Sequence, residues 1–399
     1  MRALILAAGL GANLAPFTAT RPKPMIKIGG RFILENTVKL LKESGVNDIN
    51  IVVGHRKEKI TDCFDNGMAF GVNIHYVDQG KAVGIGDAIL KAENRFNPGE
   101  YFLLIYGDIL TSSNIYIHTI QAFGSARAPV ASICLTPSSK MFGNVYLNNE
   151  MMITKIIEKP RKGTLGNYVL SGVFILPTTF FSVLREKGKN MERALAYLVR
   201  KGELAASIWE DEWIDVAYPW DILRANEITM NSWENAHIAG SVRFMGDVRI
   251  EGPVYIEDDV EIRSGTIVIG PSYIGAGSFI GNNVLIRKYT SIGPESAIGY
   301  GVELKNCILF GKTKIGRLSF IGDSVMGHNV DIGSGTMTVN RELDGKTVKT
   351  RVKDKLTDTR LSKLGAFVGD DVNIGASNTI LAGTIIKSGA NIPHHHSYP

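Results

Sequence analysis

Residues 274–299 read IGAGSFIGNNVLIRKYTSIGPESAIG, with an isoleucine at every sixth position and a glycine after most of them. A period of six does not match the ~3.6-residue turn of an α-helix. It fits a triangular coil with one short strand and one turn per side, whose recurring aliphatic residue points inward. Evenly spaced ordinary strands are the alternative, but they would not keep one phase for so long. The first series comprises Phe244, Ile250, Ile256, Ile262, Val268, Ile274, Ile280, Ile286, Ile292, Ile298, Leu304 and Phe310. The phase then slips by one residue, to Ile315 and Ile321. After an interruption the period returns at Val368, Ile374, Ile380, Ile386 and Ile392.

This repeat resembles the hexapeptide-repeat family of left-handed parallel β-helices, from Ser241 to about Ile392. The resemblance implies trimers, with ligand sites between neighbouring helices.

One segment, roughly Met337 to Lys363, interrupts the repeat and should be an excursion from the coil. Charged runs are usually solvated loops, and that is one interpretation. The other is a basic flap near a phosphorylated ligand such as coenzyme A. Its charged residues are Arg341, Lys346, Lys349, Arg351, Lys353, Lys355, Arg360 and Lys363, against Glu342, Asp344, Asp354 and Asp358.

The first ~230 residues alternate strand-like and helix-like segments, which is typical of an α/β sheet. We predict buried strands at Ala3–Ala7, Ile49–Val53, Phe102–Ile105 and Val130–Leu135, and helices at Phe32–Ser44 and Gly86–Phe96. The junction lies near Trp233 to Ala239, which gives domains 1–234 and 235–393 and a tail, 394–399. The tail carries three histidines, and we expect it to be disordered.

The composition is that of an ordinary globular protein: 44% hydrophobic and 21% charged residues in a chain of 399, with a net charge of +5. This charge does not indicate nucleic acid, and small anionic ligands fit equally well. The three cysteines are widely spaced and form no disulfide framework, so we expect a cytoplasmic protein. Residues 1–10 only faintly resemble a signal peptide, and no apolar run approaches the ~20 residues that span a bilayer.

A glycine-containing loop follows the first predicted strand and leads to an Arg-Pro-Lys-Pro element at residues 21–24. Glycines after a buried strand let backbone N–H groups approach phosphates closely. Taken alone, a glycine pair is a weak signal.

The loop resembles that of the sugar-1-phosphate nucleotidylyltransferases, and further elements follow in the family's order. They are Gln79 with Gly84-Ile85-Gly86-Asp87-Ala88, Tyr106-Gly107-Asp108, Phe142-Gly143, Glu158-Lys159-Pro160, Gly172, and Trp213-Ile214-Asp215-Val216 with Pro219-Trp220. The expected fold is therefore a Rossmann-like α/β nucleotidyltransferase domain followed by a left-handed parallel β-helix of hexapeptide repeats.

The resemblance implies that a sugar-1-phosphate oxygen attacks the α-phosphorus of a nucleoside triphosphate and pyrophosphate leaves. It implies Mg²⁺ held by Asp108 and Asp215, with the charge of Lys23 at the phosphates. The residues that the resemblance implies at the nucleotide are Ala7, Ala8, Gly9, Gly11 and Asn13, with Gln79 and Gly84 on the side of the base. The implied sugar-side residues are Gly143, Glu158, Lys159 and Gly172. UTP or dTTP is the expected donor.

Three positions depart from the family pattern. Asn13 replaces an arginine that steadies the triphosphate, and losing one such donor would cost about 10²–10³ in rate. Ile85 replaces a threonine, and Leu170 stands where many relatives have asparagine. Arg21 or Arg2 could supply the missing charge.

The β-helix resembles the acetyltransferase half of the bifunctional enzymes that make UDP-N-acetylglucosamine, including their archaeal relatives. Arg287, Lys305 and Asn340 match family positions. Arg317, however, replaces the general-base histidine, and a guanidinium cannot accept a proton near neutral pH. Phe320 replaces a tyrosine and Asp331 an asparagine. Acetyl-CoA is accordingly a doubtful ligand.

Three hypotheses follow. The first is a nucleotidylyltransferase whose β-helix serves trimerisation. The second is an impaired, nucleotide-binding regulatory or scaffold partner in a hetero-oligomer with an active relative. The third, a bifunctional nucleotidylyltransferase and acetyltransferase, is disfavoured by Arg317. None of them requires nucleic acid or a membrane.

Overall fold

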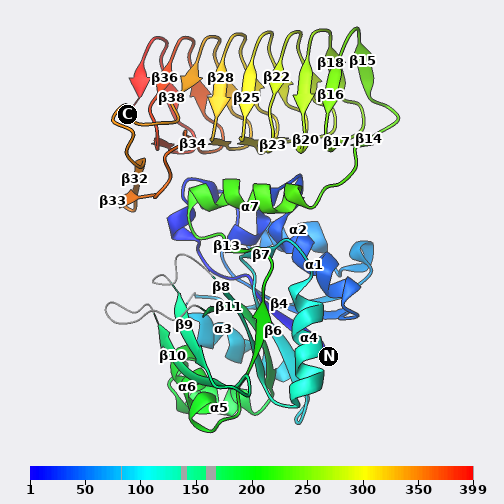
Figure 1. Cartoon of the computed structure of the whole chain (residues 1–399), viewed down its shortest axis with the longest axis vertical. Coiled ribbons are helices and arrows are strands. Elements are labelled where there is room, and N and C mark those ends of the chain that lie inside the picture. Colours follow the sequence, from blue (N-terminus) through cyan, green and yellow to red (C-terminus); the bar gives the residue numbers. More distant parts are fainter. Residues whose placement is uncertain (82, 136–141, 159–167, 399) are drawn as a thin grey trace. The chain divides into compact units, whose positions relative to one another are not determined.

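The computed structural model describes residues 1–81, 83–135, 142–158 and 168–398, and Figure 1 shows how their helices and strands follow along the chain. By packing, the chain divides into two compact units. Unit 1 contains residues 1–10, 21–25 and 33–215. Unit 2 contains residues 11–20, 26–32 and 216–399. The domain boundary that we predict at residues 234 and 235 stays a prediction.

Unit 1 is built on a nine-stranded mixed sheet with the path β10-β9-β11-β6-β1-β4-β5, in which β8 pairs with β11 and β12. The strands β1, β4, β5 and β6 run parallel, which places their carboxyl ends at one edge. The bounds are β1 (Arg2–Leu6), β4 (Asp48–Val53), β5 (Asn73–Asp78), β6 (Tyr101–Tyr106), β8 (Val130–Leu135), β9 (Gly143–Leu147), β10 (Ile153–Glu158), β11 (Tyr168–Pro177) and β12 (Ala205–Trp209).

Both faces of this sheet are covered. Leu4, Leu104 and Phe174 pack in one cluster with residues of α3, α5 and α6, while the alternate residues Ile5 and Leu103 are equally buried. Since successive strand residues point to opposite faces, helices lie on both sides, as buried parallel strands require. The helices of this unit are α1 (Ile33–Glu43), α2 (Glu58–Phe64), α3 (Ile85–Lys91), α4 (Ile115–Ala126), α5 (Phe180–Glu186) and α6 (Met191–Arg200). The six predicted strand and helix segments are confirmed, although the second predicted helix ends as α3 followed by a 3₁₀ turn, Glu93–Arg95.

Unit 2 contains the left-handed β-helix, whose three faces are parallel sheets of eight strands each. Ile274 pairs with Ile292 and Ile280 pairs with Ile298, so each coil uses three hexapeptides. The first sheet comprises β14 (His237–Ile238), β17 (Val254–Ile256), β20 (Ser272–Ile274), β23 (Thr290–Ile292), β26 (Ile308–Leu309), β29 (Val325–Met326), β34 (Phe367–Val368) and β37 (Ile385–Ile386). The second comprises β15 (Arg243–Met245), β18 (Glu261–Arg263), β21 (Phe279–Ile280), β24 (Ala297–Ile298), β27 (Lys314–Ile315), β30 (Asp331–Ile332), β35 (Asn373–Ile374) and β38 (Asn391–Ile392). The third comprises β16 (Arg249–Glu251), β19 (Ile267–Ile269), β22 (Leu285–Ile286), β25 (Glu303–Lys305), β28 (Phe320–Gly322), β31 (Met337–Thr338), β36 (Thr379–Ile380) and β39 (Ser397–Tyr398).

One member of the predicted inward series is wrong. Leu309, not Phe310, pairs with Ile292 and joins the interior stack, so the one-residue slip occurs one repeat earlier than predicted, between Leu304 and Leu309. Phe310 lies on the outside of the coil and packs edge-on against Phe17, with ring centroids 5.3 Å apart. Phe244 keeps the predicted register, since it pairs with Ile262, but it is 43% exposed because its coil is at the end of the stack.

The expected disorder of the tail is also wrong. Ser397–Tyr398 forms β39, which pairs with Thr379 and Ile380, and Tyr398 continues the six-residue period from Ile392. The backbone N–H of Ala376 donates to Nδ1 of His394 at 2.8 Å, so this histidine is part of a turn.

The predicted excursion folds into a hairpin, β32 (Lys349–Val352) and β33 (Lys355–Asp358). Met337–Thr338 still belongs to the coil, and the N–H of Leu364 donates to the carbonyl of Asn340 where the chain returns. The hydroxyl of Thr350 donates to the carbonyl of Gly383 at 2.5 Å, and Val348 is fully buried. The segment is therefore anchored on the coil.

Two N-terminal segments and α7 (Pro219–Asn231) pack with the β-helix inside unit 2. Phe17 reaches Phe310, and the side chain of Asn226 accepts from the N–H of Gly29 at 2.9 Å and donates to the carbonyl of Tyr289 at 2.8 Å. Gly29 lies between the two-residue strands β2 (Lys27–Ile28) and β3 (Arg31–Phe32).

Two further findings concern the whole described chain. None of the three cysteines, all of which lie among the described residues, forms a disulfide bond. Within the described residues, none of the helices combines the length and apolarity needed to cross a membrane.

Candidate active site

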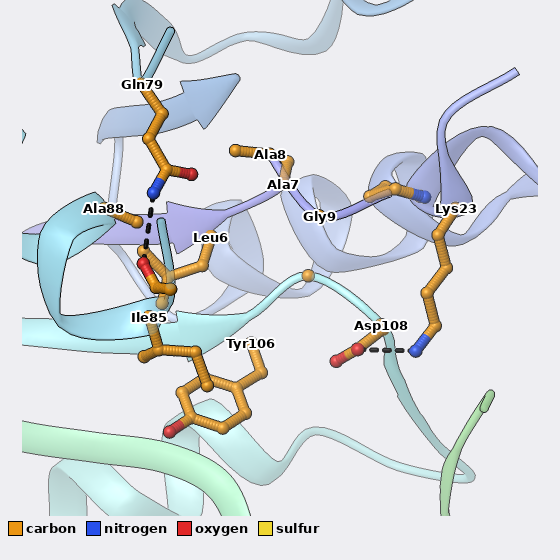
Figure 2. A pocket seen from close by; sticks show the side chains of 13 residues that line it. Leu6, Ala7, Ala8, Gly9, Lys23, Gln79, Ile85, Ala88, Tyr106 and Asp108 are labelled. Carbon is orange, nitrogen blue, oxygen red and sulfur yellow. Dashed lines mark hydrogen bonds and ion pairs between the residues drawn. The ribbon is translucent and has the colours of Figure 1, made fainter. Parts of the chain in front are cut away.

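The end of the central strand β1 opens into a cavity of about 210 Å³ in unit 1 (Figure 2). The strand's neighbour β6 ends beside it, and a Cβ on Gly107 would lie 2.6 Å from the carbonyl oxygen of Leu6. Only glycine therefore permits this approach, which places Asp108 at the same edge as the loop after β1. The cavity is lined by Leu6, Ala7, Ala8, Gly9, Lys23, Pro24, Gln79, Gly84, Ile85, Ala88, Tyr106, Gly107 and Asp108.

At one end of this cavity, the ammonium of Lys23 faces Asp108, and Figure 2 shows the contact. Its Nζ lies 2.5 Å from Oδ2 of Asp108 and 3.2 Å from Oδ1 of Asp215. Asp215 reaches this point because β13 (Trp213–Asp215) pairs antiparallel with β7 (Ile109–Thr111), which sets Asp215 opposite Ile109. The two carboxylates, more than a hundred residues apart in sequence, thus converge on one cation.

The two aspartates decide the protonation state of Lys23. Burial alone lowers the pKa of Lys23, but the charges and hydrogen bonds of Asp108 and Asp215 outweigh it and raise that pKa above its usual value. The ammonium is therefore protonated at neutral pH, and the three groups together carry a net charge of −1.

Whether Mg²⁺ fits this site can be judged from Lys23, Asp108 and Asp215. Mg²⁺ is bound in such sites by one or two carboxylates, with water and substrate phosphates completing the shell. Asp108 and Asp215 offer oxygens that already surround a cation, their side chains are 31% and 27% exposed, and no cluster of three or more acidic, histidine or cysteine side chains occurs among the described residues. The residues fit a carboxylate pair completed by substrate.

At the other end of the cavity lies Gln79, which follows β5 and is 6% exposed. Its Nε2 donates to the carbonyl of Gly84 at 3.0 Å and lies 3.5 Å from Asp87. Lys189 donates to Asp87 at 2.9 Å, and this bond, followed by that from Gln79, lowers the pKa of Asp87. The segment that resembles a base-recognition element is thus fixed by a short polar network.

A second cavity of about 580 Å³ adjoins the first and shares Gly84, Ile85, Tyr106 and Asp108 with it. The predicted sugar-side residues Gly143 and Gly172 line it, as do Leu170 and Asp215. Gly172 has a φ of 90°, and a Cβ there would lie 3.2 Å from the ring of Tyr106, so the position requires glycine.

Aromatic and basic side chains of the second cavity were not among the predicted site residues. Trp213 donates its indole N–H to the carbonyl of Ser171 at 2.9 Å, and Phe142 packs edge-on against it. The backbone of Lys189 contacts Gly86, where a Cβ would lie 1.9 Å from the Lys189 carbonyl oxygen. No local signal marks Lys189, because its place in the cavity depends on this long-range contact.

The remaining predicted residues of this site are placed differently. Glu158 ends β10, whose backbone pairs with Gly143, and Lys159 lies outside the described residues. Gly11 and Asn13 are not among the residues that line either cavity, and they pack in unit 2. Gly11 has a φ of 58° and precedes a 3₁₀ turn, Ala12–Leu14.

On the β-helix, the predicted residues form a different arrangement. Lys305 donates to Oδ2 of Asp323 at 2.8 Å, and Asn340 donates to the same oxygen at 2.6 Å. Asn306 donates to Oδ1 at 2.9 Å. Asp323, with only 6% of its side chain exposed, was not predicted, and it neutralises the lysine that resembles a phosphate ligand.

The other β-helix positions do not all join this cluster. Arg287 forms an exposed ion pair with Glu303 at 2.9 Å. A Cβ on Gly322 would lie 2.5 Å from the ring of Phe320 and 3.4 Å from Asn340, so Phe320 borders the cluster. Arg317 lies at a turn, and its carbonyl accepts from Gly335. Asp331 belongs to a different sheet, where it pairs with Lys314 and Asn373.

Comparison with known proteins agrees with this geometry. The Nucleotidyl transferase family profile matches residues 2–232. The chain belongs to the nucleotidyl transferase family. A second profile, described as the GMPPB C-terminal domain, matches residues 268–361 of the β-helix.

Two relatives of this nucleotidyl transferase span nearly its whole length. "Bifunctional protein GlmU" of Methanococcus maripaludis is 33% identical and covers 98% of this chain and 92% of its own. A "Bifunctional sugar-1-phosphate nucleotidylyltransferase/acetyltransferase" of Sulfurisphaera tokodaii is 34% identical and covers 98% and 96%. The resemblance to the sugar-1-phosphate nucleotidylyltransferases and to archaeal bifunctional relatives is thereby confirmed.

Among solved structures, a putative glucose-1-phosphate thymidylyltransferase of Bacillus anthracis superposes with a TM-score of 0.54 over 57% of this chain and 95% of its own. At 23% identity, this likeness concerns the fold alone.

Proposed function

We propose that the chain transfers a nucleotidyl group from a nucleoside triphosphate to a sugar-1-phosphate and releases pyrophosphate. The observation that carries the proposal is the meeting of Lys23, Asp108 and Asp215 where two adjoining cavities share Asp108. A nucleotide in the first cavity and a sugar phosphate in the second would react at the shared wall.

In this reaction a phosphate oxygen of the sugar forms a bond to the α-phosphorus, and the bond from that phosphorus to the pyrophosphate oxygen breaks. The chain binds and aligns the two substrates, and Lys23 holds a positive charge at the phosphates. Asp108 and Asp215 would hold Mg²⁺, which when bound neutralises charge on the phosphates. Gln79 and Gly84 would face the base, and Gly143, Glu158, Lys159 and Gly172 the sugar phosphate. UTP or dTTP is the proposed donor.

For the β-helix we propose assembly into a trimer without acetyl transfer. Arg317 offers no base, and Lys305 is already neutralised by Asp323, so neither supports transfer to an amino sugar. Acetyl transfer is the alternative to be tested, because the names of some relatives include an acetyltransferase.

A second candidate is a regulatory or scaffold partner that binds nucleotide without turnover. It is favoured by Ile85, a 44% exposed side chain that lines both cavities and offers no hydrogen bond to a substrate. The neutral Asn13 favours it as well. If the variant Asn13→Arg turns over faster than the native chain, the native loop is impaired; if it turns over more slowly, Asn13 belongs to a retuned active site.

The deciding experiment measures pyrophosphate release with Mg²⁺ for each nucleoside triphosphate against a panel of sugar-1-phosphates. An Asp108→Asn variant serves as control. Release that requires one sugar and is lost in the control supports the enzyme. Absence of release from folded protein that still binds nucleotide contradicts it and favours the partner.

A further inference from the structure

A third cavity, of about 490 Å³, lies within unit 2 and shares no lining residue with the two cavities above. Three segments form it: the 3₁₀ turn after Gly11, the N-cap of α7, and the hairpin β32–β33 that leaves the β-helix coil. It is lined by Asn13, Tyr218, Val352, Lys353, Lys355, Leu356, Thr357 and Asp358.

The hairpin turn holds Lys353 in an unfavourable conformation. Val352 pairs with Lys355, so Lys353 and Asp354 form a two-residue turn, with φ values of 47° and 62°. Turns with positive φ at both central positions favour glycine, asparagine and aspartate, so Asp354 suits its place whereas Lys353 is strained. Such strain persists only when surrounding structure holds it, and it concentrates at functional positions. Here, the buried Val352 and Thr350 hold the hairpin on the coil.

The charges of the pocket are not balanced from within. Asp358 accepts from the backbone N–H of Arg360 and from Thr347, and both bonds lower its pKa. Nearby, Asp344 pairs with Lys346 at 2.7 Å. In the part of the chain that the structure describes, no carboxylate lies within 4.0 Å of the ammonium of Lys353 or Lys355. Two lysines against one already engaged aspartate leave a net charge of +1.

The uncharged groups complement these lysines. Asn13 presents an amide and Tyr218 a phenol, and Tyr218 is held in place by stacking on Trp220 with ring centroids 4.7 Å apart. Lysine ammonium groups bind phosphates as point charges, and neutral N–H and O–H donors bind the remaining oxygens. A ligand with several anionic oxygens suits this set better than a carboxylate or a sugar.

We propose that this pocket binds a pyrophosphate or polyphosphate group between Lys353, Lys355 and Asn13. The group is either free pyrophosphate or the phosphate tail of a nucleotide, because both present several anionic oxygens. Apart from Asn13, the pocket uses none of the residues named in the proposed function. The test therefore changes Lys353 and Lys355 only, so that the two proposals can fail separately.

The test is calorimetric titration of the full-length chain with inorganic pyrophosphate. A Lys23→Gln background reduces binding at the carboxylate pair, and the double substitution Lys353→Gln/Lys355→Gln is added to it. We expect the affinity to fall about tenfold or more, because each lysine contributes a charge-assisted hydrogen bond. The matched control is Lys346→Gln, a lysine of the same excursion that does not line the pocket; it should leave the affinity unchanged. Equal affinity in the background, the double variant and the control overturns the proposal.

Two further arms identify the source of the phosphate. The affinity for UTP and dTTP is measured for the native chain and for Lys353→Gln/Lys355→Gln. If nucleotide affinity falls together with pyrophosphate affinity, the pocket receives the nucleotide's phosphate tail. If only pyrophosphate affinity falls, the ligand is a separate phosphate compound. An unchanged thermal midpoint excludes unfolding as the cause, since both lysines are exposed.

Discussion

The cleft of unit 1 and the buried cluster of the β-helix each place a lysine against aspartate, yet they are organised in opposite ways. Lys23 faces two carboxylates whose side chains are 31% and 27% exposed, so their oxygens are within reach of a divalent cation and substrate. Lys305 faces one nearly buried carboxylate, whose remaining capacity is taken by Asn306 and Asn340. An accessible group of charges can bind a ligand, whereas a buried ion pair whose carboxylate is saturated with hydrogen bonds mainly stabilises the fold.

The largest expected effect comes from breaking the carboxylate pair. Asp215→Asn should lower the turnover of the proposed transfer by about 10²–10³, because one charged group that stabilises the transition state is lost. Pyrophosphate release measures this directly. The matched control, Asp62→Asn on the exposed side of α2, should keep native turnover. A variant at Asp215 as active as this control would remove the pair from the chemistry.

Next in size is the loss of the buried β-helix carboxylate. Asp323→Ala leaves three donors without their acceptor and should destabilise unit 2 by about 3 kcal/mol. The midpoint of thermal unfolding should drop accordingly. The double variant Lys305→Met/Asp323→Leu should recover much of the loss, since an apolar pair can replace a buried ion pair. If the double variant were no more stable than Asp323→Ala, the unpaired charge would not be the cause.

A smaller effect is expected at the exposed ion pair between Arg287 and Glu303 of the β-helix. Arg287→Met should cost less than about 1 kcal/mol, because surface pairs are screened by water and salt. Comparing its unfolding midpoint with that of Asp323→Ala tests the contrast between exposed and buried charges. Equal losses would show that Arg287 has a structural role beyond its pair with Glu303.

The smallest effect concerns pH. The pKa of Lys23 is raised above its usual 10.5, so the stabilising contacts of its ammonium are complete at lower pH and are lost only as pH rises through the raised value. Between about pH 7 and 9, turnover should therefore show no inflection from this lysine. The test is the pH profile of pyrophosphate release beside that of Lys23→Arg, whose guanidinium stays protonated. An inflection between about pH 7 and 9 that disappears in Lys23→Arg would contradict the raised pKa of Lys23.

Much of unit 1 was predictable because its motifs are local. The strand before Ala7, the glycine at position 107 and the acid after it each carry a signal within a few residues. Their order predicted the family, and the cavity linings bring seven of the predicted residues together: Ala7, Ala8, Gly9, Lys23, Gln79, Gly84 and Asp108. Lys189 was not predicted, because it lines the second cavity through a contact with distant backbone. Trp213 was identified only as part of the motif around Asp215, without a role in the site.

In the β-helix, the features that the sequence determines and those that only folding decides are easier to tell apart. By itself, the sequence determined the coil, because a six-residue period repeats one local turn and stacks one aliphatic residue on the next. Tertiary structure alone decided that Leu309 replaces Phe310 in that stack, that Asp323 neutralises Lys305, and that the hairpin at Lys353 reaches Asn13. The physical reason is distance along the chain: a period is written in neighbouring residues, whereas these contacts depend on register and packing between segments that only the folded chain brings together.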